Sequence, residues 1–110
     1  MTVPSSVPTH CVPHAPLLDA TALASGLARV PAWRLEGSHA ALTRTFRFGS
    51  YHQAIAFVNA VAWIAHIEDH HPDMAVHFDR VVVQWSSHDA GGVTDNDILC
   101  AARVDALLAG

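Results

Sequence analysis

The sequence predicts an α+β fold, in which a four-stranded antiparallel sheet carries helices packed on one face. Two observations support this prediction. Segments that alternate between apolar and polar residues come in two neighbouring pairs, and segments with helical periodicity precede, separate and follow these pairs. Neighbouring short strands form hairpins, and helices bury their apolar sides against a sheet, so the order α-β-β-α-β-β-α favours helices gathered on one face.

The length and composition are those of one small domain with an arm. The chain has 110 residues, of which 51% are hydrophobic, so it can bury a modest core. Residues 1–18 hold four of the six prolines and no continuous apolar run, which predicts an irregular or mobile arm and not a targeting segment. We therefore expect a single domain over residues 19–110.

The charge distribution argues against several kinds of partner. The formal net charge is −4 and the six basic residues are scattered, so we expect no direct nucleic-acid binding and no attraction to an anionic membrane. No segment reaches transmembrane length without a charge or a histidine. Cys11 and Cys100 match no metal spacing, and free thiols in a reducing cytoplasm are expected, with one disulfide between them as the alternative.

A short helix and a hairpin are predicted first. Asp19 can cap a helix that is closed by Pro31. Residues 33–36 and 41–48 then alternate as two strands around a Glu-Gly-Ser turn. On the second strand, three apolar residues share one face: Leu42, Phe46 and Phe48.

A long helix follows the hairpin. Ser50 and Gln53 have the spacing of a capping box, and residues 54–69 have helical periodicity. This helix is apolar around most of its circumference, so a partner subunit is expected to cover its second side. We expect Pro72 to end it, because proline disfavours the α conformation at His71.

A second pair of strands and a last helix complete the predicted domain. The strands cover residues 75–79 and 80–87, and a turn follows at residues 89–92. The last helix begins at residues 94–97. Three apolar residues form its predicted inner stripe: Ala101, Val104 and Leu108.

Histidines are concentrated at and just beyond the end of the long helix, and three explanations compete. His66 and His70 lie on one helical face and could bind zinc with His88 as the third ligand, although the sequence is not H-E-x-x-H. The histidines could instead be a polar helix end that interacts favourably with the helix dipole. In the third explanation His70 and His71 diverge beside the next strand and act as acid and base near neutral pH.

The combined motif resembles the pterin-4a-carbinolamine dehydratase family, which is also known as the dimerisation cofactor of a homeodomain transcription factor. The resemblance rests on His66-x-x-x-His70-His71-Pro72, on Phe78, and on Ser87-His88-Asp89-Ala-Gly91-Gly92-Val-Thr-x-x-Asp97. Trp33, the Glu36-Gly37 turn and the strand Thr45-Phe46-Arg47-Phe48 fit it too. It covers roughly residues 19–108 and leaves out the arm.

The resemblance implies an enzyme that needs no metal and no cofactor. Its substrate would be the 4a-hydroxy-tetrahydropterin that aromatic amino-acid hydroxylases produce, and its product the quinonoid dihydropterin. It also implies dimers that assemble into tetramers. The alternative role in the family is a non-catalytic module that binds a partner protein through the long helix.

The resemblance assigns site residues without fixing each role. His70, His71 and His88 would supply the acid–base chemistry, and Asp97 would orient a histidine or the pterin ring. Asp97 also stands at capping-box spacing from Thr94, so helix capping is a second explanation for it.

Trp33 would form an aromatic wall, although an ordinary core position is the alternative. His66 stands where many members carry a carboxylate and would help to bind the substrate. Met74 replaces a common tryptophan. His77 is interpreted as a surface residue and Phe78 as a packing residue.

Overall fold

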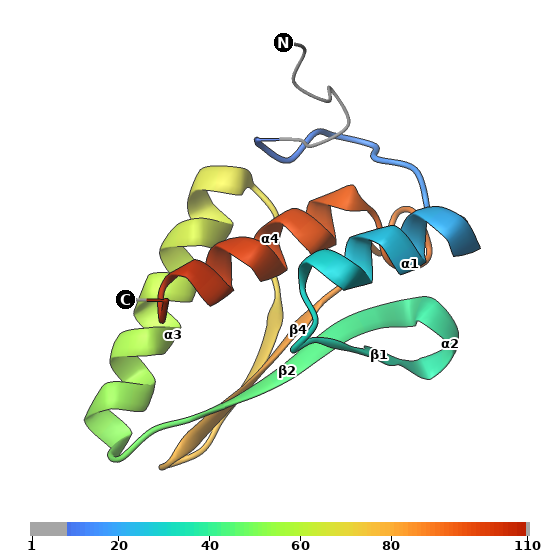
Figure 1. The fold of residues 1–110 in the computed structure, drawn as a ribbon. Helices are drawn as coiled ribbons and strands as arrows, with labels where there is room; N and C mark the ends of the chain where they lie inside the picture. The colour runs from blue at the N-terminus through green and yellow to red at the C-terminus, as the bar shows by residue number, and fades with distance from the viewer. Residues whose placement is uncertain (1–8, 110) are drawn as a thin grey trace, which may run out of the picture.

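The computed structural model describes residues 9–109, without the side chains of residues 38 and 39, and it confirms the predicted α+β fold (Figure 1). The elements, in chain order, are α1 (Ala20–Arg29), β1 (Arg34–Glu36), α2 (Gly37–Ala40), β2 (Ala41–Arg47), α3 (Tyr51–Glu68), β3 (Asp73–Val76), β4 (Arg80–Trp85) and α4 (Asp95–Ala106). Residues 1–8, which belong to the predicted arm, lie outside the described residues.

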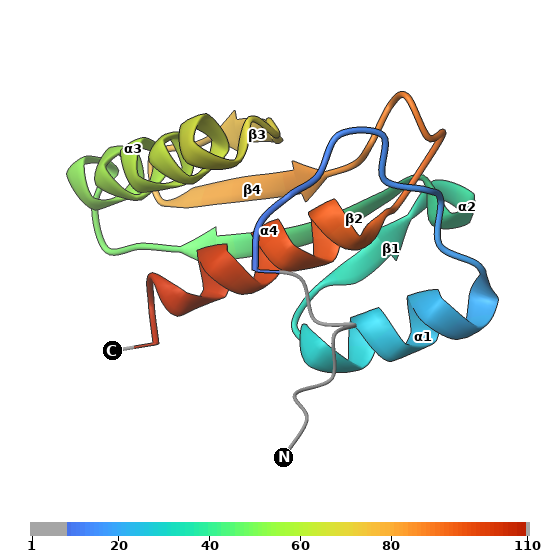
Figure 2. The same ribbon diagram turned by 90° about the horizontal axis from the view of Figure 1, so that it is seen from above.

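The four strands form one antiparallel sheet in the order β1-β2-β4-β3. The central pair is β2 and β4, in which Leu42 lies opposite Trp85 and Phe46 lies opposite Val81. These four side chains are buried, and α1, α3 and α4 pack over their face of the sheet (Figures 1 and 2). The alternation predicted for β2 and β4 therefore decides which face the helices cover.

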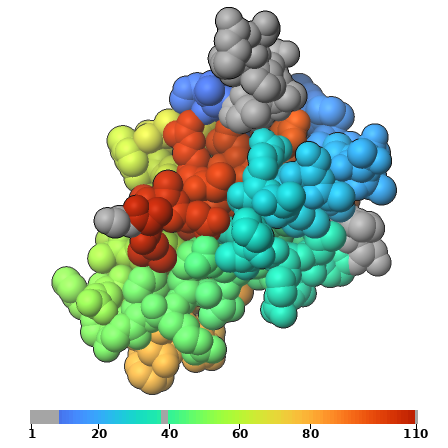
Figure 3. All heavy atoms as spheres, in the orientation of Figure 1, coloured from blue at the N-terminus to red at the C-terminus, as the bar shows by residue number. Residues whose placement is uncertain are grey.

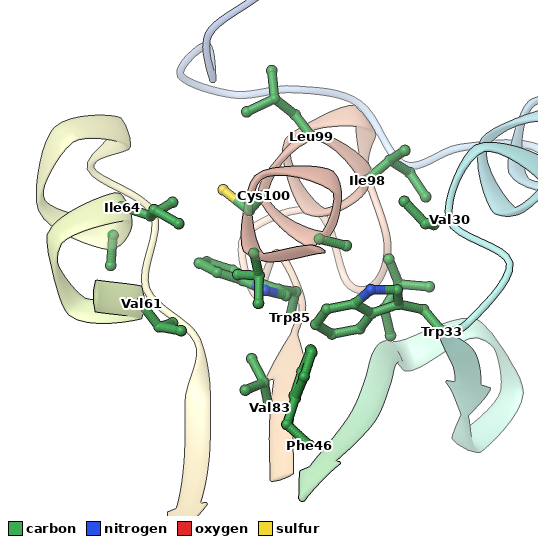
Figure 4. Close-up of a cluster of buried hydrophobic side chains, with 14 of the residues drawn as sticks. Val30, Trp33, Phe46, Val61, Ile64, Val83, Trp85, Ile98, Leu99 and Cys100 are labelled. Atoms are coloured by element: carbon green, nitrogen blue, oxygen red, sulfur yellow. The ribbon is translucent and has the colours of Figure 1, made fainter. Parts of the chain in front are cut away.

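The core lies between this face and the helices (Figure 4). Trp33 and Phe46 meet edge to face, with ring centroids 5.9 Å apart, and Phe57 of α3 packs 4.6 Å from Phe46. Trp85 is fully buried, and within the described residues its Nε1 has no hydrogen-bond partner. Aromatic rings thus fill the space where β2, β4 and α3 converge.

Three local expectations were inexact. The predicted turn after β1 is the single helical turn α2, whose Gly37 has a φ of 50°. Ser50 caps α3, but Gln53 accepts a hydrogen bond from Gly49 and does not close a capping box. The third strand begins at Asp73, two residues earlier than expected.

The end of α3 also differs from the prediction. The helix stops at Glu68, because Asp69 adopts a left-handed conformation and its N–H, like that of His70, donates to the carbonyl of Ala65. Pro72 therefore follows a helix end that is already complete.

Two packing interpretations were wrong. Phe78 is 71% exposed in the β3–β4 turn, and Leu108 is 51% exposed because α4 ends at Ala106. Local periodicity does not reveal that the elements stop short of these residues.

Helix α3 is apolar on two sides, as predicted. Its inner side buries Phe57, Val61 and Ile64, whereas Trp63 is 62% exposed and Ile67 is 52% exposed. Among the described residues, no helix combines the length and the apolar character needed to cross a membrane.

Candidate active site

The structure joins His70 directly to Asp97. The two residues are 27 apart in the chain, and Nε2 of His70 lies 2.6 Å from Oδ1 of Asp97. The histidine side chain is 15% exposed and the aspartate side chain is fully buried. His70 reaches this position because the left-handed turn at Asp69 directs the chain away from the axis of α3.

A buried hydrogen-bond network fixes the carboxylate of Asp97. Its Oδ2 accepts from the hydroxyl of Ser87 and from the backbone N–H of Thr94, each at 2.8 Å. Thr94 and Asp97 form the capping box at the start of α4, and the two hydroxyls of Ser87 and Thr94 lie 2.9 Å apart. A buried carboxylate needs such donors, so both explanations offered for Asp97 agree with the structure: it caps α4 and it holds a histidine.

This geometry selects a tautomer for His70. An ionised carboxylate can only accept hydrogen bonds, so Nε2 of the imidazole carries the proton that Asp97 receives. The ring also stacks on Trp85, with centroids 5.5 Å apart and an interplanar angle of 17°. Within residues 9–109, Nδ1 has no hydrogen-bond partner, so its lone pair is not used by the described part of the protein.

A pocket of about 370 Å³ lies next to this network. Its lining includes Asp73 and Gln84, which are register partners on β3 and β4, together with Ser87 and His88. Ser87 belongs to both features, because it lines the pocket and donates to Asp97. The volume falls in the range of small-molecule sites.

The other predicted residues are placed differently. His71 is exposed at the approach to β3, and His66 is exposed on α3, where its ring lies 5.3 Å from that of Trp63. Trp33 is only 3% exposed, and its Nε1 donates to Asp105 at 2.8 Å. Trp33 is therefore a core residue and offers no exposed wall to a ligand, because just before β1 begins it packs edge to face on Phe46.

The zinc arrangement considered from the sequence is not assembled. In the described part of the chain, no group of three histidine, cysteine or acidic residues is placed to hold a metal ion. Nε2 of His70 is directed at Asp97, and His66 packs beside Trp63.

Sequence reasoning missed the roles of Ser87 and Trp85. The hydroxyl of Ser87 reaches Asp97 because the turn after β4 folds back, with Ser87 paired to Gly92, and so brings the start of α4 beside Ser87. Trp85 follows the alternation of β4, which indicates burial but gives no sign that His70 stacks on it. The spacing of Thr94 and Asp97 was the one local signal for this network.

Comparisons with known proteins agree on one family. The family model described as pterin 4 alpha carbinolamine dehydratase matches residues 16–107. A candidate pterin-4-alpha-carbinolamine dehydratase of Xanthomonas campestris pv. campestris (strain 8004) is 54% identical over 98 residues, which cover 86% of this chain and 83% of the relative. A relative of the same description from Xanthomonas axonopodis pv. citri (strain 306) is 55% identical over 97 residues, which cover 86% of this chain and 82% of the relative.

Two solved structures are similar to the chain. One is a transcriptional coactivator/pterin dehydratase from Brucella melitensis, with a TM-score of 0.77, 30% identity, and coverage of 82% of this chain and 96% of the other. The second is a pterin dehydratase-like protein identified as a RuBisCO assembly factor in the alpha-carboxysome. It has a TM-score of 0.61, 31% identity, and coverage of 72% of this chain and 92% of the other.

Proposed function

Since the chain belongs to the pterin-4a-carbinolamine dehydratase family, we propose that it dehydrates a 4a-hydroxy-tetrahydropterin to the quinonoid dihydropterin by histidine acid–base catalysis. The observation that carries this proposal is the hydrogen bond between the partly buried His70 and the buried Asp97, which a single residue, Ser87, connects to a pocket of ligand size.

In this reaction the bond between C4a and the hydroxyl oxygen breaks, and N5 loses its proton. We assign the base to His70, because Asp97 stabilises the imidazolium that forms when Nδ1 takes the N5 proton. Two exposed imidazoles can protonate the hydroxyl, which then departs as water: His88, which lines the pocket, and His71, which lies just before β3. Proton exchange with solvent restores both groups, and no metal or other cofactor enters the reaction.

Partners and location follow as further parts of the proposal. The pterin would come from an aromatic amino-acid hydroxylase in the cytoplasm. The exposed side of α3, with Trp63 and Ile67, would join copies of the chain into a homodimer or a homotetramer, since exposed apolar side chains of this size are typical of interfaces.

A second candidate function uses the same surface of α3. The Brucella relative is named as a transcriptional coactivator as well as a dehydratase, and Trp63 is 62% exposed here. A protein-binding module of this kind would need α3 but none of the histidines.

Stopped-flow absorbance tests the catalytic proposal. Freshly generated 4a-hydroxy-tetrahydropterin is mixed with the wild type, with His71→Ala, with His77→Ala or with chelator-treated wild type. We expect wild type to accelerate decay and His71→Ala to lose a factor of about 10² or more. His77→Ala is the matched control, because His77 is exposed but lies outside the motif. If folded wild type does not make the 4a-hydroxy-tetrahydropterin decay faster than buffer does, the catalytic proposal is rejected. Partner binding through α3 then remains as the candidate function.

A further inference from the structure

Glu68 is a buried carboxylate at an unfavourable position. It is the last residue of α3, and its side chain is 2% exposed. A negative charge near the carbonyl end of a helix meets the negative end of the helix dipole, and burial removes its hydration. Other groups must therefore hold this carboxylate in place.

The partners of Glu68 come from two other parts of the chain. The backbone N–H of Cys11 donates to Oε1 at 2.7 Å, and Nδ1 of His10 lies 3.2 Å from Oε2. From α4, the guanidinium of Arg103 lies 3.6 Å from Oε2. Burial raises the pKa of Glu68, but the hydrogen bonds from Cys11 and His10 and the charge of Arg103 outweigh it, so the pKa lies below its usual value. The carboxylate is thus ionised and joins the arm to both helices.

Residues 9–12 of the arm, which include His10 and Cys11, are also bound to α4. We call these four residues the clasp. Val12 and Asn96 exchange two hydrogen bonds, with Val12 N–H donating to Oδ1 at 3.0 Å and Nδ2 donating to the Val12 carbonyl at 2.8 Å. Arg103 donates to the carbonyl of Thr9. Figure 1 shows the arm, in blue, running past the end of α3 and the start of α4, and in Figure 3 blue atoms of the arm lie at the surface above the yellow end of α3.

The clasp binds next to both members of the candidate catalytic pair. Glu68 precedes His70 by two residues, and Asn96 directly precedes Asp97. The bond between His70 and Asp97, at 2.6 Å, is itself a link from the end of α3 to the first turn of α4. Its geometry therefore depends on how these two helix ends are held relative to each other.

We propose that the clasp sets the relative position of these two helix ends and that Glu68 is a positioning residue for the His70–Asp97 pair. The hydrogen bonds and ion pairs of Glu68 go to His10, Cys11 and Arg103, so it acts through the backbone that carries His70. This inference rests on the proposed function only for the expected fall in kcat. The expected displacement of the His70 ring does not depend on which molecule binds.

A pair of thiols offers an independent means of fixing the clasp. The Sγ atoms of Cys11 and Cys100 lie 3.6 Å apart, where Cys11 is partly exposed and Cys100 is buried in α4. The hydrogen bond with Cys11 and burial both raise the pKa of the Cys100 thiol. Attack on an external disulfide therefore starts from Cys11. Oxidised glutathione would join the two sulfurs, as the thiols lose two hydrogens and the reagent becomes two molecules of reduced glutathione.

The first test compares Glu68→Gln with the matched control Glu36→Gln, which changes an exposed carboxylate on β1. Ring signals of His70 are followed by NMR without pterin, and kcat and KM are measured with pterin. We expect Glu68→Gln to move the His70 signals and to lower kcat about tenfold with KM little changed, because small displacements of a reacting group are costly. The control should change neither quantity.

Two results of this test overturn the inference. The first is a lowered melting temperature with unmoved His70 signals, which would give Glu68 a structural role only. The second is a change in KM while kcat stays constant, which would mean that Glu68 affects only substrate binding. If the wild type has no dehydratase activity, the NMR comparison still decides the positioning claim and only the proposed function fails.

The second test asks whether a covalent clasp replaces Glu68. Glu68→Gln is oxidised with glutathione disulfide, and the bridge between Cys11 and Cys100 is verified by mass spectrometry. We expect the oxidised variant to regain most of its kcat and its His70 signals, and the double variant Glu68→Gln, Cys11→Ser to regain neither. A bridged protein that still shows the displaced His70 would refute positioning by the clasp.

Discussion

Two consecutive histidines, His70 and His71, meet opposite surroundings. His70 belongs to a closed part of the site, in which its ring is 15% exposed and its bond to Asp97 is supported by Ser87 and Thr94. His71 belongs to an open part, together with His88, where both side chains are exposed. The comparison shows that one short motif can supply both a fixed group and a group free to meet a ligand.

The two parts should respond differently to substitution. A buried group that loses its hydrogen-bond partner costs free energy of folding, whereas an exposed side chain outside any network costs little. Changes in the closed part should therefore reduce both stability and activity. Changes in the open part should reduce activity alone.

Asp97→Ala should have the largest effect. It leaves Ser87, the Thr94 N–H and His70 without their acceptor, so we expect a loss of about 3 kcal/mol in the free energy of unfolding and of 10²- to 10⁴-fold or so in kcat. Urea unfolding and stopped-flow absorbance measure the two losses. Asp95→Ala, in the same helical turn, is the control. Its side chain is half-exposed and lies 3.9 Å from Arg29, so the change should cost no more than about 0.5 kcal/mol of stability. Equal effects of the two variants would contradict the closed network.

His88→Ala should separate activity from stability. The side chain lines the pocket and is exposed, so we expect kcat to fall about 10²-fold while the free energy of unfolding stays within about 0.5 kcal/mol. Stopped-flow absorbance and urea unfolding are again the measurements, and His52→Ala, exposed in the first turn of α3, is the control. A large loss of stability in His88→Ala would show that His88 belongs to the closed part of the site.

Glu68 should make stability depend on pH. Its pKa is lower in the folded than in the unfolded chain, so its ionised form stabilises the fold above the unfolded pKa, and this contribution is lost as the pH falls through the folded pKa. The groups that face it are His10 and Cys11 of the arm and Arg103 and Cys100 of α4.

Unfolding in urea at pH 7 and at pH 3 measures this contribution. We expect Glu68→Gln to be less stable than wild type by about 1.5 kcal/mol at pH 7, because hydrogen bonds to a charged acceptor are lost. The difference should shrink at pH 3. A difference that grows on acidification would show that the carboxylate is destabilising when ionised.

Trp63→Lys should have the smallest effect on the single chain. Trp63 is 62% exposed, so we expect little change in the secondary structure seen by circular dichroism and a shift to smaller species in analytical ultracentrifugation. Tyr51→Lys changes another exposed aromatic residue, at the opposite end of α3, and is the comparison. An unchanged sedimentation coefficient in Trp63→Lys would exclude this side of α3 from the assembly.

The sequence by itself determined the elements and their faces. Asp19 caps α1 through the Ala22 N–H, and the alternation along β4 identifies the residues that pack under the helices. Caps and alternation act between residues a few positions apart, so they can be found before the fold is known. The histidine motif likewise indicated the family that the comparisons found.

Only the tertiary structure decided which histidine is held and which is free. His70 meets Asp97 across 27 residues, and Glu68 meets Cys11 across 57 residues. No pattern in the sequence singled out Glu68, and residues 1–18 were predicted to be an irregular or mobile arm. Trp33 could have been a wall or a core residue, and only its packing against Phe46 in the folded chain decided between them. Burial and hydrogen bonding at these positions depend on chain segments that approach only when the helices pack on the sheet, and no local pattern encodes that approach.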